Sequence, residues 1–390
     1  MDILVSNDAY EAFLRAELGH ELVEEGLAEK RLEMAGDAFG FLRATYFRWA
    51  ETALELFPEL AGAPTVLAVG DIHLENFGTW RDAEGRLVWG VNDYDEAAEM
   101  PYALDLVRLA TSGLLASPDP DWREAGPIAE RLLDGYAKGL RKPGPTLLDR
   151  DHRWLRHTVM VPDEHRDAFW QKLKKKRKHF GRRPDDERPV FFPRYEAALR
   201  AALPQGAGRP RFWYRSAGLG SLGRPRWVAQ AKWRGDWVLR EAKAVLPSAW
   251  VRLHGRHGRA VRCLELASGR HRAPDPWYRV NDGVAVRRLS PNNRKIETDR
   301  PISPGWEHGP EEPLGREVLL GERMLRAMGR EMAAIHLGAG DHAAAIRADL
   351  AKRPAGWLRE AALRAAQATA AEHRQFAAHM ARHAEAGPSP

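Results

Sequence analysis

Apolar residues recur at intervals of three and four over the first sixty positions of the chain. The leucines that follow this spacing are Leu14, Leu18, Leu22, Leu27 and Leu32. No proline occurs before Pro58. An apolar stripe at the helical period predicts helices from residue 8 to about residue 60, and Gly36 and Gly40 are expected to divide this region into pieces.

The pattern changes to that of strands near residue 65. The run TVLAV at 65–69 is short, apolar and β-branched, which predicts a buried strand. The runs FGTW and RLVWGV then flank the turn-forming residues RDAEG, a pattern that predicts a β-hairpin. Helical spacing returns over 102–116 and 128–140.

Alternating apolar and polar residues reappear at residue 211. The runs FWYRSAG, RWVAQAKW and WVLREAKAV are separated by a glycine cluster and by the turn RGD, so they predict antiparallel strands with short connections. The run VAVRRL at 284–289 predicts a further strand. Stretches rich in alanine, leucine and methionine predict helices over 315–337 and 356–386.

The composition is that of a globular protein. The chain has 390 residues, enough for two to three domains of roughly 100–200 residues each, with 44% apolar and 29% charged residues. The single cysteine, Cys263, excludes a disulfide framework and a cysteine-rich zinc site. We see neither a secretory leader nor an apolar stretch that could span a membrane, so we expect a cytoplasmic protein without a membrane segment.

Charge is distributed unevenly along the chain. Residues 1–140 carry 11 basic and 27 acidic residues, whereas residues 141–260 carry 29 basic and 11 acidic residues. Acidic groups that hold a divalent metal and basic groups that hold a polyanion would produce this division, as would two unrelated solvated surfaces. Eight Lys and Arg residues fall within 171–183, inside a proline-rich stretch. We therefore interpret residues 141–205 as a basic insertion or linker.

Five polar residues that can carry chemistry surround the predicted hairpin. Asp71, His73 and Asn76 follow the buried strand, and Asp93 and Asp95 follow the second strand of the hairpin. A hairpin returns the chain to its starting point, so we expect Asn76 and Asp93 to lie side by side. Their oxygens suit Mg²⁺, and Asp71 is placed to accept a proton from an attacking hydroxyl. For His73, bracing of the loop is favoured over a chemical role.

A glycine-rich segment lies between two predicted strands. It reads Gly218-x-Gly220-Ser221-x-Gly223. A dinucleotide-binding loop would lead from a strand into a helix, whereas this segment leads into another strand, which is the arrangement of kinase loops whose amides cover phosphates. A simple glycine-rich hairpin turn remains the alternative.

Together these motifs resemble a known superfamily. GDIHLEN, NDYDEA and PYALDL are similar to the active-site core of the aminoglycoside-phosphotransferase and choline-kinase branch of the protein-kinase-like proteins. The resemblance implies that Asp71 is the catalytic base and that Asn76 and Asp93 bind the metal, with Asp95 as a weaker second contact. It also implies that Asp105 is a buried residue that braces the loop.

A closer resemblance is to an uncharacterised bacterial family, domain of unknown function 2252. FGFLRATY at 39–46, GDIHLENFG, NDYDEA and the glycine-rich segment carry it, and it is loosest over 141–205 and in the C-terminal third. The family's phosphate-binding strand has the form V-K-E-A, which places Arg240 where lysine is expected. Arg240 is therefore favoured as the phosphate-contacting cation, with Lys243, on the opposite face of the strand, as its substitute.

The order of these motifs is unusual, because the glycine loop follows the catalytic loop by more than a hundred residues. We therefore predict a two-lobed, protein-kinase-like α+β fold that is circularly permuted. Residues 206–290 would form a small antiparallel β lobe. Residues 1–140 and 291–390 would form the larger helical lobe, with 141–205 inserted between them.

The function predicted from these motifs is ATP- and Mg²⁺-dependent transfer of a phosphoryl group to an unidentified hydroxyl or amine acceptor, a small molecule or a protein. A nucleotide-binding pseudokinase and a nucleotidyltransferase are alternatives on the same fold. A metal-dependent phosphoesterase is a lesser alternative, because VGDIH resembles its D-x-H motif but its G-N-H-[DE] segment is missing. Non-specific nucleic-acid binding by the basic run is a further lesser alternative, and a solvated surface helix explains that run better.

Overall fold

A computed structural model describes residues 2–119, 121–255, 259–300 and 313–385. The first sixty residues form the predicted helices, which are α1 (Ile3–Leu18), α2 (Glu24–Gly36), α3 (Ala38–Ala44) and α4 (Tyr46–Leu56). Asp2 caps α1 by accepting hydrogen bonds from two backbone amides, and Asp37 caps α3 by accepting one from Gly40. The chain therefore breaks after Gly36 as expected, whereas Gly40 lies inside α3.

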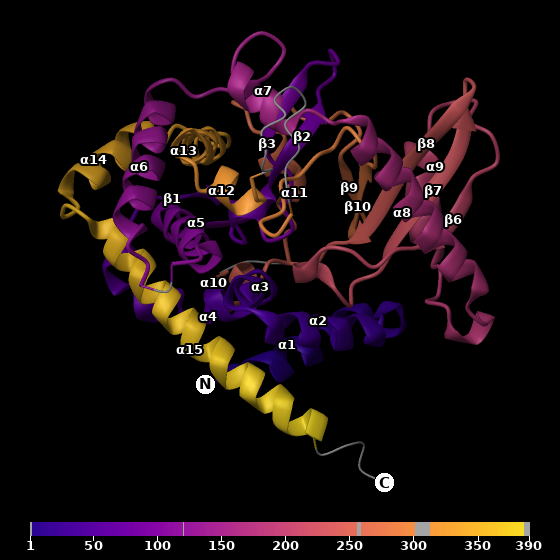
Figure 1. The fold of residues 1–390 in the computed structure, drawn as a ribbon, viewed down its shortest axis with the longest axis horizontal. Coiled ribbons are helices and arrows are strands. Elements are labelled where there is room, and N and C mark those ends of the chain that lie inside the picture. The colour runs from indigo at the N-terminus through magenta and orange to yellow at the C-terminus, as the bar shows by residue number, and fades with distance from the viewer. Residues whose placement is uncertain (1, 120, 256–258, 301–312, 386–390) are drawn as a thin grey trace.

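A helical body is assembled from both ends of the chain. Its remaining helices are α5 (Tyr102–Ala116), α6 (Ala125–Arg141), α12 (Gly315–Leu319), α13 (Glu322–His336), α14 (Ala343–Lys352) and α15 (Trp357–Glu385). Helix α15 confirms the helix predicted over 356–386, whose last residue lies outside the described residues. It runs along α5, α6 and the N-terminal helices, so the two ends of the chain share one core (Figure 1).

Close contact between α6 and α13 depends on glycine. A β-carbon placed on Gly329 would lie 2.1 Å from the carbonyl oxygen of Leu132, and one placed on Gly135 would lie 2.1 Å from that of Arg326. Any larger residue at these positions would therefore separate the two helices.

Two small sheets lie at the edge of this body. One pairs β1 (Thr65–Ala68) with β4 (Ala98–Pro101), and the other contains β2 (Phe77–Arg81), β3 (Leu87–Val91) and β5 (Thr146–Leu147). Strands β2 and β3 form the predicted hairpin, with Phe77 opposite Val91. The catalytic-loop motif lies between β1 and β2, and the acidic motif follows β3.

A separate antiparallel sheet of five strands lies beside the helical body (Figure 1). Its spatial order is β6 (Arg211–Tyr214), β7 (Arg226–Trp233), β8 (Asp236–Ala244), β10 (Val284–Arg288) and β9 (Arg279–Asn281). The glycine-rich segment joins β6 to β7, with a short turn at Leu219–Ser221. The short helices α10 (Ala249–His254) and α11 (Cys263–Ala267) follow β8. The mixed α+β class is thereby confirmed.

The segment 141–205, interpreted as a basic insertion or linker, is largely helical. It contains α7 (Arg153–Val159), α8 (Asp163–Arg182) and α9 (Pro193–Ala202). Leu173 of α8 is buried against Trp213, Val228 and Leu239 of the five-stranded sheet. Burial of this apolar patch fixes α8 on the sheet, while most of its lysines face solvent. None of the helices in the described ranges is long and apolar enough to cross a membrane.

Candidate functional site

The loop after β1 is held in place by Asp105, which is fully buried in α5. Its carboxylate accepts hydrogen bonds from the backbone amides of Val69, at 2.8 Å, and Gly70, at 3.0 Å. The Nε2 atom of His336, at the end of α13, lies 3.1 Å from the same carboxylate. Gly70 has φ of +76°, and a β-carbon there would lie 2.5 Å from the carbonyl oxygen of Glu96. The loop therefore has one well-defined path past Asp105.

Asp71 projects from this loop with its two oxygens in different surroundings. Arg108 Nη2, which is buried, lies 2.5 Å from Asp71 Oδ1. Burial raises the pKa of Asp71 above its usual value, although the charge of Arg108 opposes that rise. Because Arg108 holds Oδ1, Oδ2 is the oxygen available to a reacting group.

His73 faces the protein interior. Its Nδ1 atom accepts a hydrogen bond of 3.2 Å from the backbone amide of Glu75, and its ring packs edge-on against Phe39. Burial lowers the pKa of His73 well below its usual value, and the charge of Arg43 adds to this effect, so the ring is neutral at pH 7. This geometry favours a bracing role for His73.

The hairpin brings the end of the loop after β1 next to the acidic motif, as expected. The backbone amide of Asn92 donates a 3.0 Å hydrogen bond to the carbonyl oxygen of Asn76, so Asn76 and Asp93 are neighbours. The amide nitrogen of Asn76 donates to the carbonyl oxygen of Asp71 at 2.5 Å. The donor is the side-chain nitrogen, Nδ2, so the other end of the side-chain amide, its oxygen, is turned away from the Asp71 backbone.

Lys243, on β8, reaches both carboxylates of the acidic motif. Its Nζ atom lies 3.0 Å from Asp93 Oδ1 and 2.7 Å from Asp95 Oδ1. Burial alone would raise the pKa of Asp93, but the charges of Lys243, Lys295 and Arg287 outweigh burial and hold this pKa well below its usual value. Asp93 is therefore ionised at pH 7.

Arg240, favoured over Lys243 in the sequence, lies on the other face of β8. Its Nε atom donates to the carbonyl oxygen of Ala202 in α9 at 2.8 Å, and its guanidinium lies 4.2 Å from the centre of the Trp277 ring. A three-residue offset on a strand places side chains on opposite faces, so only one of the two cations can face the catalytic loop. In the structure that cation is Lys243.

The glycine-rich turn lies directly over the catalytic loop at one of its three glycines. A β-carbon on Gly220 would lie 3.2 Å from the carbonyl oxygen of Arg43 and 3.4 Å from Asp71 Oδ2. Gly218, with φ of +82°, lies beside Arg226 and Ser221. Arg226 Nη2 donates to Ser221 Oγ at 2.6 Å, which stabilises the turn.

The third glycine, Gly223, makes its contacts elsewhere. It has φ of +87°, and a β-carbon there would lie 2.4 Å from Leu27 Cδ2 in α2. Its carbonyl oxygen accepts a 3.0 Å hydrogen bond from the amide of Val23. Gly223 therefore anchors the turn on the helical body.

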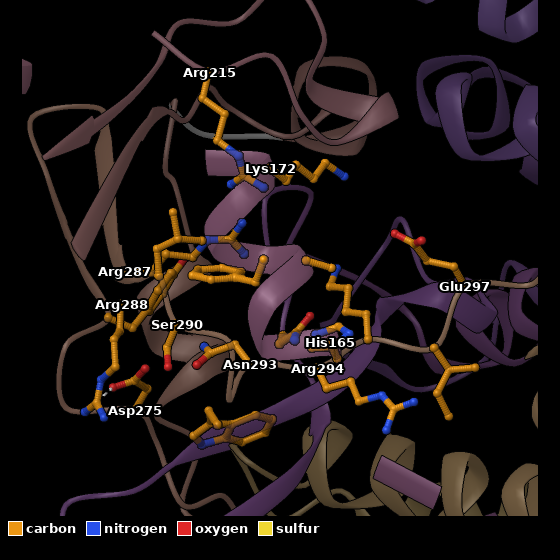
Figure 2. A pocket seen from close by; sticks show the side chains of 18 of the residues that line it. His165, Lys172, Arg215, Asp275, Arg287, Arg288, Ser290, Asn293, Arg294 and Glu297 are labelled. Atoms are coloured by element: carbon orange, nitrogen blue, oxygen red, sulfur yellow. Dashed lines mark ion pairs between the residues drawn. The ribbon is translucent and has the colours of Figure 1, made fainter. Parts of the chain in front are cut away.

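A pocket of about 350 Å³ opens beside the acidic motif and is bordered by Asn92 and Tyr94 (Figure 2). Seven of its lining residues are Lys or Arg, namely Lys172, Arg215, Arg287, Arg288, Arg294, Lys295 and Arg300. Two lining residues are acidic, and one of them, Asp275, lies 3.6 Å from Arg288. The pocket is thus strongly cationic and suits a ligand with several negative charges.

Arg287 and Lys295 differ in whether a carboxylate neutralises their charge. Arg287 shares Glu241 with Arg215 and Arg226, and that carboxylate is fully buried. The side-chain ammonium of Lys295 makes neither a hydrogen bond nor an ion pair with the described residues, while the backbone of Lys295 bridges to Gly78. Burial lowers the pKa of Lys295 to about 8, although the negative charge of Asp93 opposes this effect. An anion in the pocket would therefore pair with Lys295 without displacing an existing partner.

The pocket cations were missed in the sequence because they come from four separate segments. Lys172 comes from α8, Arg215 follows β6, Arg287 and Arg288 belong to β10, and the remaining three lie between 294 and 300. The consecutive arginines of VAVRRL were the one available signal. Glu265, an acidic residue that follows β8 in the sequence, pairs at the surface with Arg262 and does not reach Lys243 or Arg240.

The oxygen donors near the catalytic loop fit a hard divalent cation. Within the described ranges no three His, Cys, Asp or Glu side chains are grouped to hold a metal. Mg²⁺ commonly uses one or two carboxylates and completes its coordination with waters and substrate phosphates. That partial set could come from Asp93, Asp95 and the side-chain oxygen of Asn76. In the structure the single ammonium of Lys243 pairs with both carboxylates.

The structure thus brings cations, several oxygen donors and one partly desolvated carboxylate close together. Residues 22–179 match the sequence model of a family described as an uncharacterized protein conserved in bacteria, DUF2252. The match confirms the resemblance to that family over the catalytic loop and the hairpin; the glycine-rich turn and Lys243 lie outside it. No curated protein and no solved structure matches the chain.

Proposed function

We propose that the protein is an ATP- and Mg²⁺-dependent phosphotransferase. The observation that supports this best is the meeting of three distant segments beside one cationic pocket. Lys243 lies 3.0 Å from Asp93 although 150 residues separate them, and the Gly220 turn lies against Asp71. A catalytic carboxylate, a metal-binding carboxylate, a cation and a glycine turn are the parts that phosphoryl transfer requires.

The phosphates of the nucleotide would lie between the five-stranded sheet and the acidic motif. Lys243, Lys295 and Arg287 would bind them, and the backbone amides around Gly220 would cover them. Asn76, Asp93 and Asp95 would hold Mg²⁺, which when bound supplies neutralisation of the phosphate charge. Most of the rate enhancement would come from this positioning and charge neutralisation.

Asp71 would orient and deprotonate the acceptor hydroxyl. Its Oδ2 atom faces the glycine turn, whereas Oδ1 is held by Arg108. Burial raises the pKa of Asp71, which makes it a better proton acceptor than an exposed aspartate. Asp105 would keep the loop in register by its two backbone contacts.

We also propose that the fold is a circularly permuted form of the two-lobed kinase-like fold. The five-stranded sheet would be the small lobe, and the helical body that combines both ends of the chain would be the large lobe. His336 supports this, because it ends a helix late in the chain and yet contacts Asp105 beside the catalytic loop.

Nucleotide binding without transfer is the second candidate. It would agree with the close approach of Gly220 to Asp71, because the turn limits the space for an acceptor beside Oδ2. A phosphoesterase with Asp71 and His73 as metal ligands is less well supported, since Arg108 pairs with the first and the amide of Glu75 donates to the second.

The basic run gives little support to nucleic-acid binding. Three of its cations are held within the protein, with Lys176 donating to the carbonyl oxygen of Ser216, Arg177 to Gln230 and Arg183 to Glu25. Lys172 lines the cationic pocket. The first half of α8 therefore forms part of the wall of that pocket.

The test is thermal unfolding with ATP, GTP or ADP, each with and without Mg²⁺. Ligand at 100 times its dissociation constant should stabilise the protein by about 2.7 kcal/mol. Asp93→Ala should remove the Mg²⁺-dependent part of this stabilisation, whereas Asp341→Ala, at an exposed position, should not. No nucleotide-dependent shift in the wild type would contradict the proposal.

Turnover separates the two candidates. Asp71→Asn should abolish phosphoryl transfer and preserve nucleotide binding. If the wild type binds ATP and Mg²⁺ but neither hydrolyses ATP nor transfers phosphate to any acceptor in a broad panel, binding without transfer is the function.

A further inference from the structure

A second cavity, of about 280 Å³, lies behind the catalytic loop, on the part of the helical body formed by α3, α4, α5 and α15. Phe41, Leu42 and Leu56 give it apolar walls, and Ala365 and Ala368 of α15 close one side. None of its lining residues borders the cationic pocket. It is therefore a separate site.

Two side chains in its lining hold buried hydrogen-bond donors that lack acceptors. Arg108 is fully buried, and within the described part of the chain its Nε and Nη1 atoms have no partner. Trp49 is 5% exposed, and its Nε1 atom is likewise unpartnered. The guanidinium lies 5.3 Å from the centre of the Trp49 ring, so the two sets of donors are neighbours.

Unpaired buried donors are costly, each by about 1–3 kcal/mol, unless an acceptor is supplied. Arg108 and Trp49 offer donors only, and an ionised carboxylate offers acceptors only. The other cation of the cavity, Arg48, is already paired with Glu51 and Glu372. Within the described residues, the buried donors of this cavity that lack an acceptor are therefore those of Arg108 and Trp49.

We infer that this cavity binds a small organic carboxylate, whose anionic end accepts hydrogen bonds from Arg108 and Trp49 and whose apolar body lies against the cavity walls. The same Arg108 binds Asp71 Oδ1 through Nη2. A ligand that draws on Arg108 weakens its hold on Asp71, so the cavity is coupled to the catalytic loop. Binding of a carboxylate in this cavity needs no nucleotide, and the inference does not depend on whether the protein transfers phosphate.

The probe for the test is benzoate, and its neutral isostere benzamide is the control ligand. Saturation-transfer NMR titrations on the full chain without nucleotide should show saturable benzoate binding at least tenfold tighter than benzamide binding. Trp49→Phe removes the indole donor and keeps an aromatic ring, and it should weaken benzoate binding by about tenfold.

A pair of neighbouring substitutions on α15 tests the location. Ala368→Leu fills the cavity and should abolish benzoate binding, whereas Gln367→Leu, at an exposed position, should leave it unchanged. Both variants keep the helix, so a difference between them reports the cavity. Equal binding to both variants would overturn the assignment, as would absent saturation or equal binding of benzoate and benzamide by the wild type.

The coupling has its own readout. Asp71→Asn removes the charge that competes for Arg108, so benzoate should bind this variant severalfold more tightly than the wild type. A purely structural role of Arg108 would leave the affinity unchanged, and that result would overturn the coupling.

Discussion

Replacement of Lys243 by methionine tests how β8 of the five-stranded sheet is held to the acidic motif that follows β3. Lys243 is 4% exposed, and it separates Asp93 from Asp95. Removing one partner of a buried ion pair costs about 3–5 kcal/mol, and partial exposure of Asp93 reduces this, so we expect Lys243→Met to lower the free energy of unfolding by about 2–4 kcal/mol at pH 7. Methionine has a similar length, so the loss reports charge rather than a cavity.

The loss should depend on pH in a definite direction. The pKa of Asp93 is depressed in the folded protein, so its contribution to stability is present above its unfolded-state pKa of about 3.9 and is lost as pH falls through the folded value. In Lys243→Met the main source of that depression is gone. The stability difference between wild type and variant should therefore be full at pH 7 and shrink below about pH 4, where Asp93 becomes protonated in the unfolded chain.

Urea unfolding at several pH values measures both effects. The matched control is Lys142→Met, at an exposed lysine for which no ion pair is recorded in the described structure, and it should change stability by less than about 0.5 kcal/mol. Asp95→Asn added to Lys243→Met should restore part of the loss, because one of the two facing carboxylates is neutralised. A Lys243→Met variant as stable as the control at pH 7, or a loss that does not change with pH, would refute the reasoning.

Three further predictions concern the loop, the helical body and the pocket. Asp105→Ala leaves two buried backbone amides without an acceptor and should cost about 3 kcal/mol in urea unfolding. Gly329→Ala places a methyl group 2.1 Å from a backbone oxygen and should lower stability by about 1–3 kcal/mol, whereas Gly144→Ala, with open space around it, should not. Lys295→Met should weaken ATP binding at least tenfold by calorimetry, with Lys142→Met as its control.

Each of these outcomes can fail on its own. Wild-type stability of Asp105→Ala would mean that the loop has another brace, and a Gly329→Ala variant as stable as Gly144→Ala would mean that α6 and α13 can separate freely. Unchanged ATP affinity in Lys295→Met would place the phosphates outside the cationic pocket.

The hairpin and the neighbouring positions of Asn76 and Asp93 could be predicted because local rules determine them. A turn sequence between two alternating runs sets the register, and the register sets which residues meet at the open end. The same is true of the helices, whose apolar period is visible in the chain.

The choice between Arg240 and Lys243 could not be made in this way. Alternation shows that the two lie on opposite faces of the strand, but only packing decides which face meets the helical body. Helix α9 covers the face of Arg240, where the backbone of Ala202 accepts its hydrogen bond. The resemblance to the family motif favoured Arg240, whereas in the folded protein it is Lys243 that faces the acidic motif.

Helix α8 was not predicted because its apolar surface is sparse. Leu173 is its single fully buried residue among the described ones, and lysines surround it. The helix is fixed by a small cluster that its own sequence does not reveal, with partners on three strands. The cationic pocket was missed for the same reason, since its lining converges only after α8 packs on the sheet.

The contact of His336 with Asp105 makes the order of synthesis matter for this chain. The loop after β1 is synthesised long before His336, which contacts Asp105, and before α15, the long helix that closes the core behind Arg108. A nascent chain therefore carries an incompletely supported loop until His336 and α15 have been translated. A truncated product, released early, would present the acidic motif without the packing that gives it shape.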